Sequence, residues 1–152
     1  MKNFLIAAAL VLSSVAAHAQ DARVQSLIGK LTKLNGKSGV ATSTVEREGS
    51  GRCTLRVETD ESGTSIFFDD TGYYFTPVAH IFDDAEAVSD SVVLVSTSSD
   101  RPGGDACGTA GGAIRYKKTV SLVGKTVKIE ETFRCSLELF KKYELTSTCT
   151  IN

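Results

Sequence analysis

The sequence contains no tryptophan, two prolines and two histidines, and none of its four cysteines forms a Cys-x-x-C pair. His18 lies in the N-terminal segment, which leaves His80 for the rest of the chain. Zinc sites use closely spaced Cys and His ligands, and calcium loops use an Asp-x-Asp-x-Asp-Gly pattern that is absent. A Gly-x-Ser-x-Gly elbow and a glycine loop followed by Lys-Ser/Thr are also absent. We therefore predict no catalytic residue, no metal and no cofactor.

The N-terminal segment has the features of a cleaved signal peptide. Lys2 precedes an apolar stretch from Phe4 to Val15, and Ala17-His18-Ala19 fits a signal-peptidase site. The apolar stretch is shorter than the roughly 20 residues that a spanning helix needs, so no stable membrane span is expected. We predict a signal peptide over 1–19, a single domain over 20–152, and a periplasmic or secreted location.

All four cysteines lie in the predicted mature part: Cys53, Cys107, Cys135 and Cys149. An even number of cysteines in an exported chain is typical of a disulfide framework. We therefore predict two disulfides that staple the domain.

Charge is distributed unevenly, although the net charge is −1. From Glu58 to Asp105 there are eleven acidic residues and one basic residue, Arg101, whereas from Cys107 onward eight basic residues face four acidic ones. Such asymmetry can mark a binding face, but complementary or separate solvated faces are the simpler interpretation. The lysine pairs at 117–118 and 141–142 lack interleaved aromatic residues, so no nucleic-acid binding is predicted.

An amphipathic helix is predicted from Asp21 to Asn35. Its apolar residues recur at three- and four-residue steps: Val24, Leu27, Ile28, Leu31 and Leu34. Asp21 suits the N-terminal end, and Asn35-Gly36 is a stop signal because Gly adopts the left-handed conformation cheaply. We expect the apolar stripe to pack on a sheet, with a partner or a lipid surface as the alternative.

Short strands are predicted after Gly36. The expected strand segments are Val40–Glu46, Cys53–Glu58, Thr64–Phe68, Tyr73–Thr76, Ser91–Ser96, Ala113–Val120 and the stretch 125–151. Pro77 is expected to end a strand or lie at an edge, and 78–86 is left open between a helical turn and a loop. The predicted fold class is α+β, mainly β: one N-terminal helix packed on a curved antiparallel sheet or partial barrel of seven to eight strands. This shape resembles a lipocalin barrel, although the Gly-x-Trp mark of that family is absent.

The C-terminal stretch alternates, with apolar side chains at odd positions. Two such strands share a buried face only if their connection holds an odd number of residues or a bulge. A turn at Ser136–Glu138 and a loop at Phe140–Glu144 both satisfy this condition. We prefer the second, which places Cys135 opposite Cys149 and leaves Cys53 to bond Cys107.

Asp70-Thr71-Gly72 resembles the catalytic turn of retroviral-type aspartic proteases. Asp69 intervenes after the apolar pair, Tyr73 follows the glycine, and the sequence holds no second such turn. Asp and Gly also favour ordinary hairpin turns, which is the interpretation adopted here.

His80 could form a triad with Asp83 or Asp84 and a serine. Spacing in the sequence does not bring three side chains together, so we interpret His80 as a surface or packing residue.

The longest irregular segment is the glycine-rich stretch 97–112. Its candidate contact residues are Arg101, Pro102, Asp105 and Cys107. Export, disulfides and the lack of a catalytic set favour a non-enzymatic binding or envelope-interaction protein, whose partner is an unknown protein or a small apolar ligand. The alternative is a small secreted protease inhibitor or toxin-like effector that uses this loop. An envelope hydrolase using Asp70 or His80 is a distant third.

Overall fold

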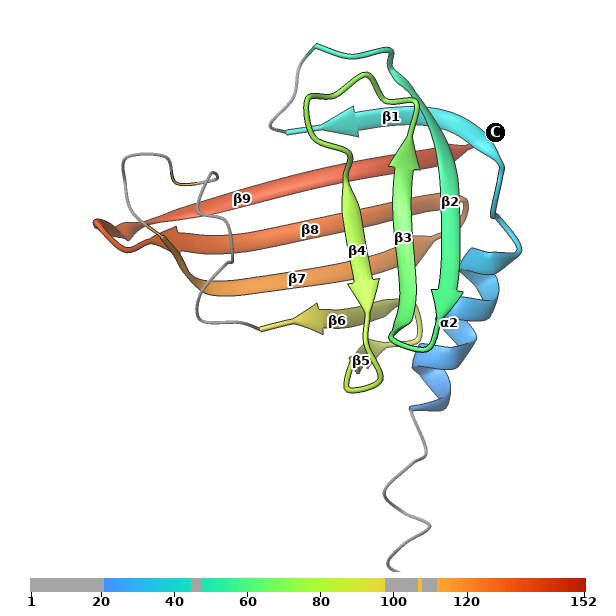
Figure 1. Cartoon of the computed structure of the whole chain (residues 1–152), viewed down its shortest axis with the longest axis horizontal. Coiled ribbons are helices and arrows are strands. Elements are labelled where there is room, and N and C mark those ends of the chain that lie inside the picture. The colour runs from blue at the N-terminus through green and yellow to red at the C-terminus, as the bar shows by residue number, and fades with distance from the viewer. Residues whose placement is uncertain (1–20, 45–47, 98–106, 108–111) are drawn as a thin grey trace, which may run out of the picture.

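A computed structural model describes residues 21–44, 48–97, 107 and 112–152. Within these ranges there are one helix and nine antiparallel strands, and the strands form a curled half-barrel sheet (Figure 1). The elements are α2 (Ala22–Thr32), β1 (Ser38–Ser43), β2 (Arg52–Asp60), β3 (Gly63–Asp69), β4 (Val78–Ile81), β5 (Glu86–Ser89), β6 (Val92–Ser96), β7 (Ala113–Val123), β8 (Thr126–Cys135) and β9 (Glu138–Ile151). The mainly β class is confirmed, and the number of strands exceeds the predicted seven to eight.

The segment around Pro77 differs from the prediction. Tyr73–Thr76, expected to be a strand, is a loop with a bend at Tyr74 and Phe75. Pro77 precedes β4 instead of ending a strand, and β4 pairs with β3 so that Ser65 opposes His80. The extra strands β4 and β5 come from the region that composition left open, because short edge strands take their conformation from a neighbouring strand.

The strand order is β4-β3-β2-β1-β9-β8-β7-β6-β5. Two antiparallel meanders, β1 to β4 and β5 to β9, join where β1 pairs with β9, with Ala41 opposite Cys149. In Figure 1 the strands β2, β3 and β4 cross in front of the strands β6 to β9. The sheet is therefore folded over on itself, with β1 at the bend.

The bend at β1 explains the disulfide that joins Cys53 in β2 to Cys149 in β9. Their Cα atoms lie 5.9 Å apart, although strands on either side of a third strand in a flat sheet lie about 9.6 Å apart. The inward positions of β1 hold small residues, Gly39 and Ala41. A methyl group on Gly39 would lie 2.0 Å from the carbonyl oxygen of Thr150. Small residues thus let the sheet close tightly enough for the two cysteines to bond.

The predicted disulfide pairing, Cys135–Cys149 with Cys53–Cys107, is wrong. The second observed disulfide joins Cys107 to Cys135. In the β8–β9 hairpin, Val127 opposes Cys149 and Cys135 opposes Glu138, so Cys135 lies about 36 Å along β9 from Cys149. The connection is a tight turn at Ser136 and Leu137, next to a register shift between Arg134 and Cys135. Ile129 opposes Ser147, so the alternative register with a turn at Ser136–Glu138 is wrong as well as the preferred one. The condition of an odd connection or a bulge is met by the register shift.

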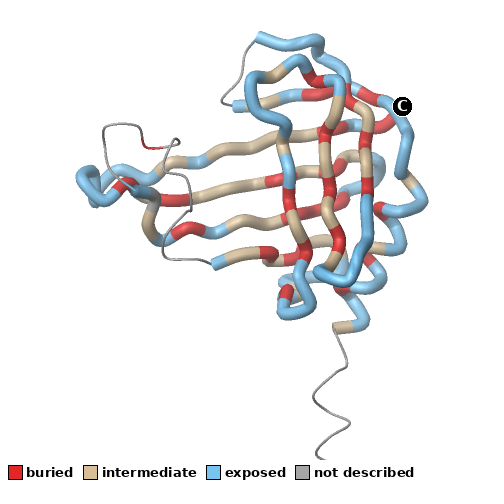
Figure 2. Tube along the Cα trace, viewed as in Figure 1, coloured by how far each residue is buried: buried red, intermediate tan, exposed pale blue. Residues whose placement is uncertain are grey.

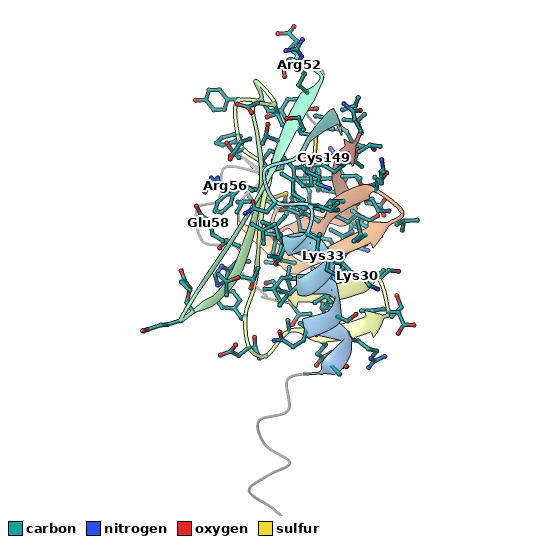
Figure 3. All side chains as sticks on the ribbon, turned by 90° about the vertical axis from the view of Figure 1, so that its right-hand side faces the viewer. Lys30, Lys33, Arg52, Arg56, Glu58 and Cys149 are labelled. Carbon is teal, nitrogen blue, oxygen red and sulfur yellow. A yellow bond between two sulfur atoms is a disulfide. The ribbon has the colours of Figure 1, made fainter. Side chains whose placement is uncertain are left out.

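Helix α2 closes one end of the folded sheet. The Asp21 side chain accepts a hydrogen bond from the backbone N–H of Arg23, as the predicted start signal requires. The helix ends at Thr32, three residues before the predicted end at Asn35, and Gly36, with φ +74°, lies in the turn that follows. Val24, Leu27 and Leu31 are fully buried in the core. Figure 3 looks onto this end, with the helix in front of the strands. The apolar stripe is thus used for packing.

The main core lies where the two strand layers overlap, and it is filled. The side chains of Leu55, Ile66, Phe68 and Val120 have no surface that water can reach. A void large enough for a water molecule beside them would expose such a surface, so the core around them is filled. Figure 2 shows buried positions gathered in this overlap and exposed positions at the end of the β8–β9 hairpin. The distal part of β7 to β9 extends beyond the overlap and has a small core of its own.

No helix in the described ranges is long and apolar enough to cross a membrane. The two disulfides indicate an oxidising, extracytoplasmic location. The predicted signal segment, 1–19, lies outside the described residues.

Candidate functional site

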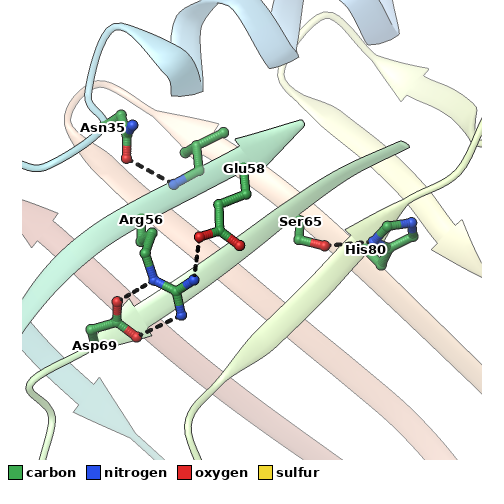
Figure 4. A network of polar contacts seen from close by, with 7 residues as sticks. Asn35, Arg56, Glu58, Ser65, Asp69 and His80 are labelled. Atoms are coloured by element: carbon green, nitrogen blue, oxygen red, sulfur yellow. Dashed lines mark hydrogen bonds and ion pairs between the residues drawn. The ribbon is translucent and has the colours of Figure 1, made fainter. Parts of the chain in front are cut away.

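His80 and Ser65 oppose each other on the outer face of β3 and β4 (Figure 4). The Ser65 hydroxyl lies 2.6 Å from Nδ1 of His80, and Nε2 of His80 lies 3.2 Å from the Ser62 carbonyl oxygen. Because a carbonyl only accepts, Nε2 carries the proton and Nδ1 accepts from Ser65. The Ser62 carbonyl thus takes the position that a carboxylate holds in a catalytic triad. A neutral carbonyl stabilises a positively charged imidazolium less than a carboxylate does. Neither Asp83 nor Asp84 takes that position.

Asp70, the candidate of the protease-like turn, is used in the turn itself. Its φ is +61°, and its carboxylate accepts a hydrogen bond of 2.6 Å from the Thr54 hydroxyl. Its backbone carbonyl accepts another of 2.6 Å from Ser50. These contacts are those of a structural turn, as the simpler interpretation predicted.

The outer face of β2 and β3 carries a network centred on Arg56. Its guanidinium lies 2.6 Å from Asp69, 2.7 Å from Glu58 and 3.9 Å from the centre of the Phe67 ring. Figure 4 shows the two carboxylates on either side of the arginine. The Asp69 and Glu58 carboxylates raise the pKa of Arg56 above its usual range, so the arginine stays charged. Arg56 therefore links β2 to β3, and its charge is already paired with the carboxylates of Asp69 and Glu58.

A polar cluster on the inner face marks the boundary between the two cores. Lys118 and Glu131 form a largely buried ion pair of 3.1 Å, and the Tyr116 hydroxyl donates to Glu131 at 2.8 Å. Lys118 also donates to the carbonyl of Val78 in β4, at 3.0 Å. These contacts tie the edge strand β4 onto β7, and no sequence pattern predicted them because the residues meet only in the folded sheet.

The distal core beyond this cluster is aromatic and disulfide-bonded. It contains Cys107, Tyr116, Phe133 and Cys135, with Tyr143 and Leu145 packed against it. The Phe133 and Tyr143 rings are stacked, with centroids 5.3 Å apart and an interplanar angle of 6°. The disulfide and the stacked rings thereby brace the β7–β9 projection close to its end, which makes the turn there a fixed protrusion.

The tip of the β8–β9 hairpin exposes three apolar side chains within four residues. Phe140 is 99% exposed, Leu137 75% and Leu139 53%. Single exposed apolar residues are common on soluble proteins, but a group at the end of a projection marks an interaction site. We refer to Leu137, Leu139 and Phe140 as the apolar tip.

Basic side chains surround the apolar tip. Arg134 directly opposes Lys142 across the hairpin, and Lys141 adjoins Phe140. Arg115 and Lys117 lie on β7 beside the same part of β8. The acidic residues of this distal segment are Glu138 and Glu144, which contact Lys141 at 3.8 Å and Lys142 at 2.5 Å. The distal segment therefore carries a net positive charge, and we call its five cations, Arg115, Lys117, Arg134, Lys141 and Lys142, the basic collar.

Several features of this end reduce stability. Arg115 has φ +51°, an uncommon conformation for a residue other than Gly, Asn or Asp, within a register shift between Ile114 and Lys117. A second shift follows Arg134, and like charges directly opposite each other, such as Arg134 and Lys142, are destabilising. Strain of this kind gathers at functional sites, and bulges there reorient side chains.

Acidic turns lie away from this basic end. Asp60 and Glu61 join β2 to β3, and Asp83 and Asp84 follow β4, on the strand layer that crosses in front of β7 to β9 (Figure 1). The sequence asymmetry therefore corresponds to separate solvated faces.

Of the predicted contact residues, Cys107 forms the disulfide with Cys135, which directly precedes the turn at the end of the projection. Arg101, Pro102 and Asp105 lie outside the described residues. The apolar tip was missed because the alternating pattern suggested buried positions for Leu137 and Leu139. The one available signal was Phe140, which interrupts that alternation at an even position.

Comparisons with known proteins do not add a function. No protein-family model matches this chain, and no curated protein matches it significantly.

Proposed function

We propose that this is an exported, non-enzymatic binding protein of the cell envelope that makes its contact through the apolar tip. The observation that carries the proposal is Phe140, fully exposed at the end of a projection braced by the Cys107–Cys135 disulfide. Packing alone gives no reason to place a large aromatic side chain in water there.

A small apolar ligand is less well supported as the partner. The helix side chains in the core are fully buried, and the hollow beside β5 and β6 has a volume of about 170 Å³, below the 300–1,000 Å³ usual for ligand pockets. A hollow of about 520 Å³ lies at the hairpin tip, but it is lined by six consecutive residues, Ser136 to Lys141, at the end of one hairpin. A macromolecular surface can cover this whole end, whereas a small ligand would contact a single stretch of chain.

The non-enzymatic part rests on the contacts of the candidate residues. In the part of the chain that the structure describes, the ring nitrogens of His80 are within hydrogen-bond distance of the Ser65 hydroxyl and the Ser62 carbonyl and of no carboxylate, and Asp70 accepts a hydrogen bond from Thr54. In the described ranges no three His, Cys, Asp or Glu side chains lie together as metal ligands would.

Retention on the envelope fraction of the producing cells tests this proposal. The mature chain is compared with L137S/F140S, and with V123S as a matched control, because Val123 is also 68% exposed but lies alone in the β7–β8 turn. We expect the double variant to lose retention at least tenfold and V123S to keep it. Both variants should keep their free energy of unfolding within about 0.5 kcal/mol, since surface substitutions rarely change it more. Retention that is absent, or equal in all three proteins, would overturn the proposal.

The second candidate function, an inhibitor, keeps one supporting observation. Cys107, from the glycine-rich segment, is bonded to Cys135 beside the turn of the protruding hairpin, so the two segments are joined at one end of the molecule. Inhibition of a panel of secreted proteases that was lost in L137S/F140S would favour this candidate.

A further inference from the structure

We infer that the apolar tip and the basic collar together bind the surface of an anionic phospholipid bilayer. Leu137 and Phe140 would enter the boundary between headgroups and acyl chains, and the collar would contact lipid phosphates. This inference rests on the proposed function, because it names the partner of the same contact site.

The shape of the tip fits a bilayer. Leu137 lies in the two-residue turn, and the exposed Leu139 and Phe140 lie in the irregular first part of β9 beside it, around a hollow of about 520 Å³. A protein partner would need a surface shaped for this end, whereas the soft interface of a bilayer accepts an exposed apolar group of any outline.

The order of side chains along the hairpin fits the depth profile of that interface. Lys141 and Lys142 follow Phe140 directly, in the stretch where residues 138 to 142 of β9 oppose a single step of β8, so both lysines are attached close to Phe140. Interfacial segments bury their apolar face about 5–10 Å into the boundary region. Lysines attached beside an inserted Phe140 can extend to the phosphates.

The charge of the collar selects anionic lipids. Its five cations exceed the two nearby carboxylates, Glu138 and Glu144, and the Arg134–Lys142 pair places two cations side by side. An anionic surface relieves the repulsion within that pair. The Tyr143 hydroxyl and the Glu138 carboxylate raise the pKa of Lys141, which keeps this lysine charged.

The rest of the molecule fixes its orientation on such a surface. The acidic turns after β2 and β4, with Asp60, Glu61, Asp83 and Asp84, lie away from the hairpin tip (Figure 1). An anionic surface repels them, so the projection meets the bilayer end-on.

The absence of tryptophan supplies a direct probe. The variant F140W carries the only tryptophan, and V123W is its matched control at an exposed site in the β7–β8 turn. Mature protein is mixed with vesicles of phosphatidylcholine alone, or of phosphatidylcholine with phosphatidylglycerol. We expect the fluorescence of F140W to shift to shorter wavelength on the anionic vesicles only, and the fluorescence of V123W to stay unchanged.

Vesicle co-sedimentation gives the second readout. We expect K141Q/K142Q to weaken binding to anionic vesicles by about 30-fold, since each basic residue near such a surface contributes about a fivefold factor. K30Q/K33Q, on helix α2, is the control for a loss of two charges elsewhere and should bind as the parent does. Urea unfolding of each variant shows that it is folded.

Two results would overturn the inference. One is an F140W spectrum unchanged by anionic vesicles, and the other is equal binding to neutral and anionic vesicles. If either occurs while L137S/F140S still loses retention on the envelope fraction, the proposed function stands and the partner is a protein.

Discussion

Cys53 and Cys149 are separated by 96 residues, and their disulfide joins β2 to β9 across β1. The bond is possible because the sheet bends at β1, where Gly39 and Ala41 present little bulk. The two halves of the sheet close on the core at this bend. The distal β7–β9 projection, with its own disulfide, extends beyond it.

Removal of the two disulfides should have unequal effects on stability. For loops of 96 and 28 residues, the chain-entropy relation gives losses of about 4.7 and 3.6 kcal/mol in the free energy of unfolding. We therefore expect C53A/C149A to be less stable than C107A/C135A when both are unfolded in urea. A larger loss in C107A/C135A would show that the distal core carries more of the fold than the bend does.

Two glycine substitutions should change the free energy of unfolding in opposite directions. In G39A the added methyl group meets the Thr150 carbonyl at 2.0 Å, and we expect a loss of about 2–3 kcal/mol because backbone must move. In G29A nothing lies within 4 Å of the new methyl group, so the helix should gain about 0.5–1 kcal/mol. Thermal unfolding of the two variants measures both changes. A neutral G39A would contradict the close approach at the bend.

The Lys118–Glu131 pair should couple more strongly than an exposed pair. Both side chains are about 15% exposed, so their attraction is less screened than that of Lys142 and Glu144. A double-mutant cycle with K118M and E131Q should give a coupling of about 1–2 kcal/mol, against about 0.5 kcal/mol or less for K142M and E144Q. Equal couplings would mean that solvent reaches the inner pair.

The pKa of Asp60 should rise when Ser62 is replaced. The Ser62 hydroxyl and backbone N–H donate to the Asp60 carboxylate at 2.6 and 2.8 Å, which lowers the pKa of Asp60. A carboxylate with a lowered folded-state pKa contributes stability above its unfolded pKa of about 3.9, and this is lost as the pH falls through the folded value. NMR titration should therefore show a higher pKa for Asp60 in S62A than in the parent. An unchanged pKa would show that Ser62 is not its cause.

Ser65 should not behave as a catalytic nucleophile. Its hydroxyl donates to His80, but the opposite nitrogen of His80 meets a backbone carbonyl. We expect no covalent labelling of the parent by a fluorophosphonate probe, with S65A as the control for background. If the parent were labelled and S65A were not, Ser65 would be a nucleophile and the protein would be a hydrolase.

Local chemistry explains what the sequence determined by itself. Asp21 and the stripe of Val24, Leu27 and Leu31 act within a few residues of one another, so the helix and its start followed from their spacing, although the helix ends at Thr32 and not at Asn35. Alternation in β2 and β8 likewise showed which side chains are buried, because side chains of a strand alternate between faces.

The bend at β1, the disulfide pairing and the contact site were decided by the tertiary structure. The partner of Cys149 depends on β1 lying between β2 and β9, a contact between chain segments that no local pattern encodes. Leu137 and Leu139 continue the alternation of buried residues, yet they are exposed because no layer covers the end of the projection. Periodicity states which residues share a face, and only the packing of the two layers states where that face is covered.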